Sequence, residues 1–318
     1  MHDQGWVQPS CREWHTFSPR EIEGYRAAIR AKAGPVASPR DIRRRINAAK
    51  NIKQITRAMQ FVAASKLRRA QESTLAARPY SEKIDEVLAD VAAVLGSEDH
   101  PLLADPTGRK RLLVLIKTDR GLAGPLNTNT IRFVAREILD HPGDLAVVSV
   151  GRKGRDAMRR TRVPIEAHFA GFGDKPTFAD VLPLASLITQ DFLSGDYGRI
   201  DLVYSRFVST LSQRPILDQI LPIQPTEDTE GIPGNQFIFE PSPAAVLEQL
   251  LPRYVATRLF HAILEAKASE ESSRMVAMKN ATENAGELID DLTLVYNKVR
   301  QSNITREMIE IATGAQAR

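Results

Sequence analysis

The sequence predicts an α/β protein in which two long helical arms, one near each end of the chain, flank a central βαβ sheet domain. Three observations predict it. An apolar stripe at helical spacing begins after residue 38, strand-like and helix-like stretches alternate between residues 110 and 240, and residues 253–285 contain neither glycine nor proline. With 318 residues, 42% hydrophobic and 26% charged, the composition is that of an ordinary globular protein of about two domains.

Composition excludes several classes of protein. The single cysteine, Cys11, allows no intramolecular disulfide and no zinc site of paired cysteines, so we expect a reducing compartment. The longest apolar run, Leu112–Ile116, is far shorter than the roughly 18 residues needed to span a bilayer.

Residues 1–37 show no sustained periodicity, and we expect them to form an extension outside the fold. A transit peptide is the functional alternative. The acidic residues Asp3, Glu13, Glu21 and Glu23 speak against it, because such peptides are poor in acids.

The N-terminal arm is predicted over residues 38–96. Ser38 can cap the free N–H groups of a helix, and Pro39 suits the first helical position. Pro79 should kink or interrupt this helix, and Gly96 should end it. The apolar stripe consists of Ile42, Ile46, Ala49, Ile52, Ile55, Met59, Val62, Ala63, Leu67 and Ala70.

The central domain is predicted over residues 110–240. Strands are expected at 112–116, 145–150 and 200–207, with helices at 126–140 and 181–193 between them. Residues 213–223 and 236–239 would add strands near the edge of the sheet, and residues 224–235 read as an exposed loop.

The C-terminal arm is predicted over residues 242–318, as one helix that ends at Gly314. At 1.5 Å per residue it would be roughly 100 Å long, more than one domain can cover, so it needs a companion helix. The segment 40–95 is the candidate. Leu288, Leu292, Val295 and Val299 have the heptad spacing of a coiled-coil seam.

Residues 40–70 carry a strongly basic block, with ten basic side chains against one acid, a local balance of 10 − 1 = +9. Such a block suits nucleic acid, anionic lipid or an acidic protein surface.

Motifs for catalysis are scarce. The sequence has no phosphate-binding G-x-x-x-x-G-K-[ST], no G-x-G-x-x-G, no G-x-S-x-G and no histidine pair at metal-ligand spacing. Two turns, Thr118–Gly124 and Gly151–Arg155, follow predicted strands and open helices, where an anion could bind. The simpler interpretation is a pair of βα turns in which Thr118 or Asp119 caps a helix.

Both arms together resemble the γ subunit of F-type ATP synthases. The N-terminal arm contributes IRRRIN (42–47), NIKQITRAM (51–59) and VAASK (62–66). The C-terminal arm contributes RMVAMKNAT (274–282), YNKVRQ (296–301), ITRE (304–307) and EIATGA (310–315), and TDRGLAGPLN (118–127) resembles the family's Asp-Arg-Gly-Leu segment. The resemblance covers about residues 38–317.

The resemblance implies a long antiparallel left-handed coiled coil beside a Rossmann-like βαβ sheet domain. It implies a rotor inside the hexamer of α and β subunits, which couples ion flow to ATP synthesis and hydrolysis and has no catalytic site or cofactor of its own. The ε subunit and the c-ring would be further partners, nucleic acid would not, and the location would be peripheral, on the cytoplasmic face of a bacterial inner membrane. Protons and sodium ions both stay open as the driving ion.

Site residues carried over from the family fall into two sets. Contacts with the β catch loops and the hexamer are expected at Met59, Arg274, Arg300, Gln301 and Thr305. A basic shaft is expected from Arg43, Arg44, Arg45, Lys50, Lys53, Arg57, Lys66, Arg68 and Arg69.

The sequence departs from the family at Lys117, where a small hydroxyl residue is usual, at Ala123-Gly124-Pro125, and in the extension before Ser38. The central domain has no cysteine, so thiol switching is not expected. A nucleic-acid-binding helical protein and a nucleotide-binding enzyme remain the alternatives. The basic block supports the first, although Phe61 is its one aromatic residue, and the two glycine-containing turns support the second.

Overall fold

A computed structural model describes residues 38–95, 100–104, 110–140, 143–161, 163–224, 240 and 242–316. The expected extension 1–37, the expected strand 236–239 and nearly all of the expected loop 224–235 lie outside these residues. The chain divides into two compact units. Within the described residues, one unit consists of 38–62 with 275–316, and the other of 63–274.

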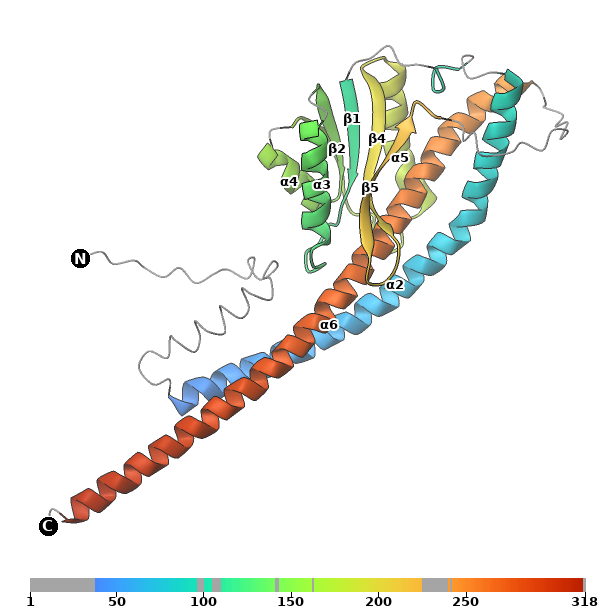
Figure 1. The fold of residues 1–318 in the computed structure, drawn as a ribbon. Helices are drawn as coiled ribbons and strands as arrows, with labels where there is room; N and C mark the ends of the chain where they lie inside the picture. The colour runs from blue at the N-terminus through green and yellow to red at the C-terminus, as the bar shows by residue number, and fades with distance from the viewer. Residues whose placement is uncertain are drawn as a thin grey trace, which may run out of the picture. The chain divides into compact units, whose positions relative to one another are not determined.

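The second unit is built on one five-stranded sheet with the strand order β3-β2-β1-β4-β5 (Figure 1). The first four strands are parallel, and β5 pairs with β4 in the antiparallel sense. The strands are β1 (Lys110–Ile116), β2 (Leu145–Val150), β3 (Ile165–Phe169), β4 (Tyr197–Phe207) and β5 (Gln213–Leu221). The chain moves outward from β1 to β2 and β3, then returns to β4 on the other side of β1. This order is that of a doubly wound α/β domain with an added antiparallel strand.

Helices cover both faces of the sheet. They are α2 (Pro39–Leu95), α3 (Leu126–Asp140), α4 (Arg152–Thr161), α5 (Phe178–Leu193) and α6 (Pro243–Gln316). Alternation along β1 separates two cores, because successive strand residues point to opposite faces. Leu113 and Leu115 pack in a small core with residues of α3 and α4, whereas Leu112, Val114 and Ile116 belong to a larger core with residues of α5, α6 and the last turns of α2.

Most elements expected in the central domain are confirmed, and the structure contains one strand that the sequence did not predict. The strands at 112–116, 145–150 and 200–207 and the helices at 126–140 and 181–193 are present, and α4 follows the Gly151 turn as expected. Strand β3 was not expected. Its five residues, Ile-Glu-Ala-His-Phe, carry two polar side chains and are only partly buried at the sheet's edge.

The long helices differ from the sequence prediction in detail. Ser38 accepts a hydrogen bond from the Asp41 amide through its Oγ (3.3 Å), so the expected cap is confirmed. Helix α2 runs through Pro79 without interruption, and the carbonyl that loses its partner there belongs to exposed Leu75, where water can bind it. Helix α6 runs past Gly314 to Gln316, so the expected stop at Gly314 is wrong by two residues.

The first unit pairs the beginning of α2 with the last part of α6. Thr282 donates a hydrogen bond from its Oγ1 to Thr56 Oγ1 (2.8 Å), and Lys53 lies over Gly286. As α2 goes from 53 to 56, α6 goes from 286 to 282, so the two segments are antiparallel, as the resemblance implies. Their inner side chains follow the heptad spacing of a coiled coil, with Ile42, Ile46, Ala49 and Thr56 on one helix and Met278, Thr282, Ala285, Ile289, Leu292, Tyr296 and Val299 on the other.

Five residues assigned to these inner faces lie outside them. Ile52, Ile55 and Val62 of α2 and Val295 of α6 are about half exposed, and Leu288 is also exposed. Thr56 and Gln60 on α2, and Ile289 and Tyr296 on α6, occupy the less exposed positions instead. Hydrophobicity alone identified a helical stripe, but it did not distinguish the side that faces the neighbouring helix from a second apolar side.

Candidate functional site

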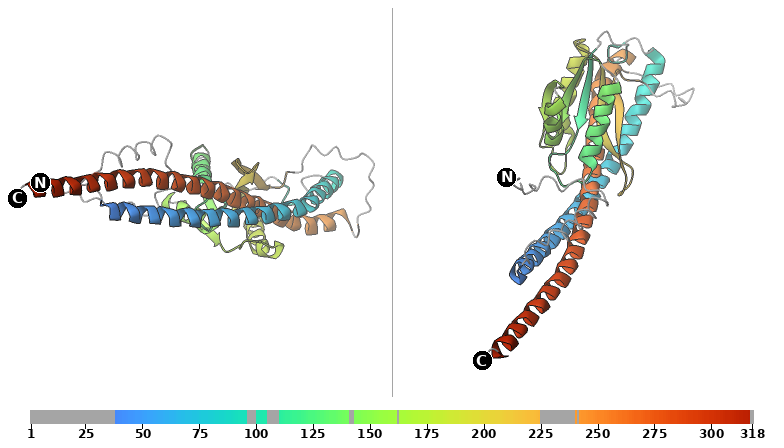
Figure 2. Two further views of the ribbon diagram at one scale, coloured as in Figure 1. Left: turned by 90° about the horizontal axis from the view of Figure 1, so that it is seen from below. Right: turned by 60° about the vertical axis from the view of Figure 1, so that its left-hand side comes forward.

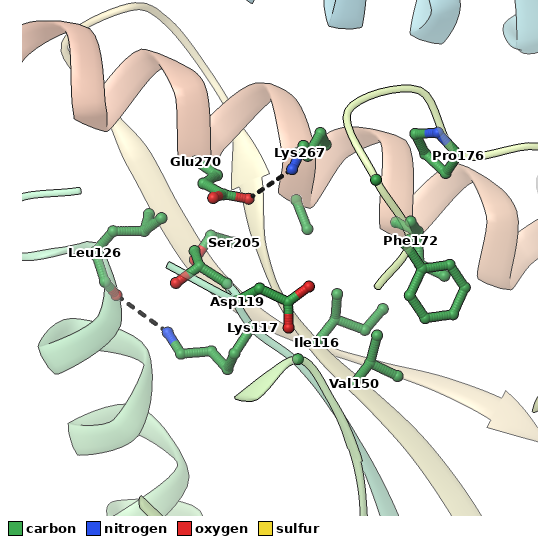
Figure 3. A pocket seen from close by; sticks show the side chains of 15 residues that line it. Ile116, Lys117, Asp119, Leu126, Val150, Phe172, Pro176, Ser205, Lys267 and Glu270 are labelled. Atoms are coloured by element: carbon green, nitrogen blue, oxygen red, sulfur yellow. Dashed lines mark hydrogen bonds and ion pairs between the residues drawn. The ribbon is translucent and has the colours of Figure 1, made fainter. Parts of the chain in front are cut away.

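The carboxyl ends of β1 and β4 border a small cavity of about 50 Å³ (Figure 3). This is the point where the strand order reverses, at which open α/β sheets usually bind ligands. The lining includes Lys117, Asp119, Ser205, Lys267 and Glu270, together with apolar side chains such as Ile116 and Phe172. The nucleotide-enzyme alternative depends on what these polar groups can do.

Lys117 places its ammonium group beside a backbone carbonyl, and among the described residues no carboxylate pairs with it. Its Nζ donates to the Leu126 carbonyl (3.3 Å), as Figure 3 shows, and its stem lies against Gly154. Burial lowers the pKa of Lys117 to about 7, because the charged form loses hydration without gaining a counter-ion.

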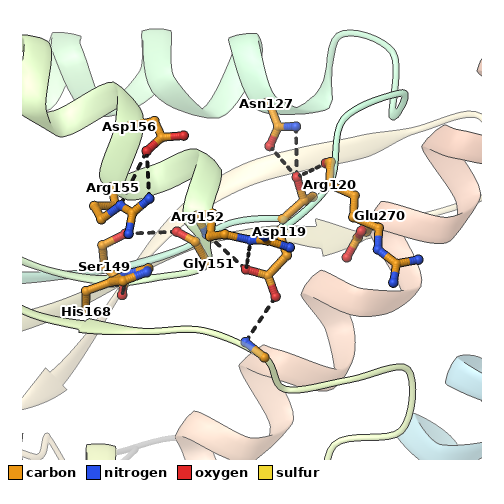
Figure 4. A network of polar contacts seen from close by, with 12 residues as sticks. Asp119, Arg120, Asn127, Ser149, Gly151, Arg152, Arg155, Asp156, His168 and Glu270 are labelled. Carbon is orange, nitrogen blue, oxygen red and sulfur yellow. Dashed lines mark hydrogen bonds and ion pairs between the residues drawn. The ribbon is translucent and has the colours of Figure 1, made fainter.

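Asp119 joins the two glycine-containing turns (Figure 4). Its Oδ1 accepts a hydrogen bond from the Arg152 amide at the start of α4 (3.0 Å), and its Oδ2 accepts one from the Gly171 amide (3.1 Å). The carboxylate therefore occupies the N-terminus of α4, where an anion would otherwise bind. The simpler interpretation of these turns, with Asp119 as a helix cap, is confirmed.

Gly151 is required by the close approach of the two turns. Its φ is +95°, and a Cβ at this position would lie 2.1 Å from the Lys117 carbonyl oxygen. Thr118 completes the arrangement: its Oγ1 donates to the Arg120 carbonyl (2.7 Å) and accepts from Asn127 Nδ2 (2.9 Å). Hydrogen bonds within the chain thus already hold the groups that a phosphate-binding loop would leave free.

The described residues contain no group of three or more His, Cys, Asp or Glu side chains that could hold a metal ion. Among the helices described, none is long and apolar enough to cross a membrane.

The last turns of α6 form a different kind of surface. From Ile304 onward every side chain of α6 with a described exposure is exposed, and the red end of α6 runs past the blue start of α2 (Figure 2). Large apolar side chains are among them, and others are exposed on the paired segments. The exposed set of the first unit is Ile52, Ile55, Phe61, Val62, Leu288, Leu294, Val295, Ile304, Met308, Ile309 and Ile311.

The structure separates the expected catch-loop contacts. Arg300, Gln301 and Thr305 are exposed together near the unpaired end of α6, where Thr305 Oγ1 donates to the Gln301 carbonyl of its own helix. Met59 is partly buried, and the antiparallel pairing places it opposite the part of α6 near Met278, about twenty residues from Arg300. Met59 and the Arg300 group therefore cannot form one contact site.

Arg274 is buried and bound within the chain. Its guanidinium donates to Glu270 (2.6 Å) and Glu271 (2.7 Å), and these charges raise the pKa of Arg274 against the effect of burial. No sequence signal separated it from the exposed arginines, because its carboxylates lie three and four residues earlier on an ordinary-looking helix.

The basic shaft residues are mostly solvent-facing. Lys66 differs, because it is partly buried and pairs with Asp174 at 2.8 Å. Arg44 lies 3.7 Å from Asp41 and Arg68 pairs with Glu72 at 3.0 Å, both on the exposed side of α2. The exposed members are Arg43, Arg44, Arg45, Lys50, Lys53, Arg57, Arg68 and Arg69.

Comparison with known proteins decides the family. The sequence model described as ATP synthase matches residues 38–317. A protein of Dehalococcoides mccartyi named ATP synthase gamma chain is 48% identical over 284 residues, which cover 89% of this chain and 99% of that one. A second, from Pelotomaculum thermopropionicum, is 43% identical over 280 residues, covering 88% and 99%.

This chain belongs to the ATP synthase gamma chain family. The fold agrees with this assignment. The rotor of the Euglena gracilis mitochondrial ATP synthase matches with a TM-score of 0.60 at 22% identity, covering 84% of this chain and 98% of that one. A second structure of the same enzyme, containing its F1 part and c-ring, matches with a TM-score of 0.62 and covers 88% and 94%. The γ chain assignment and the central-stalk fold account for the long helices that no single domain covers.

Proposed function

We propose that this γ chain is the central-stalk rotor that turns inside a hexamer of alternating α and β subunits and couples ion flow to ATP synthesis and hydrolysis. The observation that carries the proposal is the end of α6, which continues beyond α2 with large apolar side chains in water. Exposed apolar surface on this scale is typical of a protein–protein interface. A ring of subunits around the helix would cover it from every side.

The two sides of the paired arms support the same proposal. One side of α2 packs on α6, and a second side carries Ile52, Ile55 and Val62 in water. A two-helix coiled coil needs only the first apolar side. The second side is explained by further neighbours, which the α and β subunits would supply.

Coupling requires that rotation changes the affinity of each catalytic site, and this needs contacts that differ between the three β subunits. Arg300, Gln301 and Thr305 are proposed as such contacts, since their side chains are exposed beyond the start of α2. Met59 is proposed for a separate contact with the hexamer, farther from the C-terminal end of α6. Arg274 is proposed to contact the hexamer only through guanidinium N–H groups that do not already bind Glu270 and Glu271.

The exposed basic shaft residues are proposed to run past acidic surfaces of the hexamer. The ε subunit and the c-ring are proposed as partners of the sheet-containing unit, and the chain as a peripheral subunit on the cytoplasmic face of a bacterial inner membrane. Bacterial relatives at 43% and 48% identity support this location.

We also propose that the chain has no catalytic site of its own. The carboxylate of Asp119 fills the helix N-terminus that a nucleotide's phosphates would need, and the cavity of about 50 Å³ beside it is far smaller than the roughly 300 Å³ of ordinary ligand pockets. Neither a nucleotide cofactor nor a metal is part of the proposal.

The first test is co-expression of α and β subunits with and without this chain. We expect one copy of the chain per three αβ pairs and a higher rate of ATP hydrolysis. A chain that stays unbound and leaves the rate unchanged would contradict the proposal. Titration with DNA at several salt concentrations would then test the nucleic-acid alternative, which predicts steeply salt-dependent binding.

The contact residues are tested by the double variant Gln301→Ala and Thr305→Ala. We expect normal folding, because both side chains are exposed, and lower coupled activity of the assembled enzyme. Thr293→Ala is the matched control: Thr293 is also exposed on α6, and its hydroxyl donates to the Ile289 carbonyl of its own helix. Activity of the double variant equal to that of the parent chain would remove Gln301 and Thr305 from the contact surface.

A further inference from the structure

Six consecutive residues of α6, Ser269–Arg274, are all buried, with exposed fractions between 0 and 9%. A helix on a protein surface exposes one side in every turn of 3.6 residues. Burial of six residues in a row means that other parts of the chain surround α6 at this level. None of the six is apolar, so the hydrophobic effect does not explain why the helix is enclosed here.

The three serines of this run each donate a hydrogen bond to a backbone carbonyl of the sheet-containing unit. Ser269 donates to Ser205 at the end of β4 (2.7 Å) and Ser272 donates to Thr210 in the β4–β5 turn (2.8 Å). Ser273 donates to Ala123 in the loop between β1 and α3 (2.7 Å). The acceptors thus lie in two separate parts of the chain, the β4–β5 hairpin and the loop after β1.

The serines lie on one side of α6 and the charged residues on the other. At about 100° per residue, Ser269, Ser272 and Ser273 fall within about 100° of the helix circumference. Glu270, Glu271 and Arg274 occupy the opposite side, where the two carboxylates bind the guanidinium. Gln213 of β5 adds a hydrogen bond to Ser272 Oγ (3.3 Å).

Hydrogen bonds to fixed carbonyls constrain a helix in a way that apolar packing does not. Apolar contacts have no preferred direction and hold a helix by shape alone, whereas each hydrogen bond to a fixed carbonyl also requires one orientation of its donor. A rotation of α6 by one residue would break all three serine bonds and leave buried donors and acceptors without partners.

We propose that Ser269, Ser272 and Ser273 are positioning residues that fix the rotation angle and axial register of α6 within the sheet-containing unit. The residue after Arg274 on the same helix is the first of the arm segment 275–316. A torque applied to the sheet-containing unit is therefore passed to the arm by a helix whose rotation relative to that unit is prevented by the three serine bonds. This inference rests on the proposed rotor function.

The test measures the torsional stiffness of the rotor in the assembled enzyme. The α/β hexamer is fixed to a surface, and a bead is attached to the sheet-containing unit through Leu193→Cys, in a chain whose Cys11 is replaced by serine. Leu193 is exposed at the end of α5. Stiffness follows from the angular fluctuations of the bead while the enzyme waits for ATP.

The variants are Ser269→Ala, Ser272→Ala and Ser273→Ala, separately and together. Thr257→Val is the matched control, because Thr257 is buried on the same helix but its hydroxyl donates to the Arg253 carbonyl of α6 itself. We expect a loss of stiffness in the triple variant, a smaller loss in the single variants, and none in the control. Hydrolysis by the unloaded complex should stay at the parent rate in all of them, which a general folding defect would not allow.

Unchanged stiffness in a triple variant that assembles normally would overturn the inference. If the triple variant does not assemble, unchanged stiffness in all three single variants overturns it. Failure of the proposed function is distinguishable, because the parent chain itself would then fail to assemble with α and β.

Discussion

Replacing Lys117 by methionine should stabilise the sheet-containing unit, and by an amount that depends on pH. The ammonium group is held beside the Leu126 carbonyl without a carboxylate, and burial lowers its pKa from 10.5 to about 7. Between these two pH values the unfolded chain binds a proton that the native chain does not. The free energy of unfolding of the wild-type chain therefore rises as the pH goes from about 7 to 10.5.

The size of the effect follows from the same two pKa values. Each tenfold change in proton affinity corresponds to about 1.4 kcal/mol. Burial of Lys117 therefore lowers the free energy of unfolding by at most about 5 kcal/mol below pH 7, where the native lysine is charged. At pH 9, where the lysine loses its proton on folding, it lowers the free energy of unfolding by about 2 kcal/mol. Methionine removes this cost at every pH and loses one hydrogen bond of about 1 kcal/mol. Thr130 Oγ1 still donates to the Leu126 carbonyl, so that oxygen keeps a partner. The advantage of Lys117→Met should be about 2–3 kcal/mol larger at pH 6 than at pH 9.

Urea unfolding of the free chain, followed by circular dichroism at pH 6, 7.5 and 9, measures this difference. Lys153→Met is the control, since Lys153 is exposed on α4 and its replacement should have no comparable pH dependence. An advantage of Lys117→Met that is equal at all three pH values, or that grows toward pH 9, would refute the assignment of a buried, uncompensated ammonium.

Three further substitutions test the packing of the two units. Asp119→Ala should lower the free energy of unfolding by about 1–3 kcal/mol, because the amides of Arg152 and Gly171 lose their acceptor. Urea unfolding measures this loss. The control is Asp156→Ala, which removes only an exposed ion pair and should lower the free energy of unfolding by less than about 1 kcal/mol. Gly151→Ala should lower the free energy of unfolding by more than about 3 kcal/mol or prevent folding, because its Cβ would overlap the Lys117 carbonyl and its φ is positive. Gly143→Ala, with open space around the new Cβ, should leave the free energy of unfolding nearly unchanged in the same assay. Gly286→Ala should raise the stability of the paired arms by about 0.5–1 kcal/mol in thermal unfolding, because the nearest atom to the new Cβ is the flexible end of Lys53; a lower melting temperature would contradict this packing.

The strands and helices of the central domain could be predicted because their apolar periodicity is local. Leu112–Ile116 reads as a buried strand by itself, and α3 and α5 show their own helical pattern. Strand β3 could not be predicted in this way. Its pairing with β2 is decided by backbone hydrogen bonds at the edge of the sheet, and two of its five side chains are polar.

The inner side of the arms was only partly predictable, for a different reason. Ile52 and Ile55 are as apolar as Ile42 and Ile46, yet the first two are exposed and the last two are buried. A sequence shows which residues avoid water but not which neighbour covers them. In a chain with several partners, the most regular apolar stripe can therefore combine two different surfaces.

The contacts of Asp119 lay beyond sequence reasoning because they are distant along the chain. Its acceptor atoms serve amides 33 and 52 residues later. A capping role could be foreseen from the turn that contains it, but the helix that it caps could not. The serines of α6 are similar, since Ser273 and its acceptor in Ala123 are 150 residues apart.

Polar contacts fix the register of α6 in each of the two units. In the first unit, Thr56 and Thr282 form a hydrogen bond between paired helices at a position where leucine or isoleucine would bury more apolar area. In the second unit, three serines bind backbone carbonyls where apolar side chains could have filled the space. Both choices give up some hydrophobic stabilisation, and each gains a bond that exists in one register only. Leucine at these positions would bury more apolar area but would leave the buried carbonyls without a donor, whereas the hydroxyl groups satisfy them at one defined angle of the helix. The placement of hydroxyl groups along α6 therefore suits a helix that transmits a rotation at a defined angle.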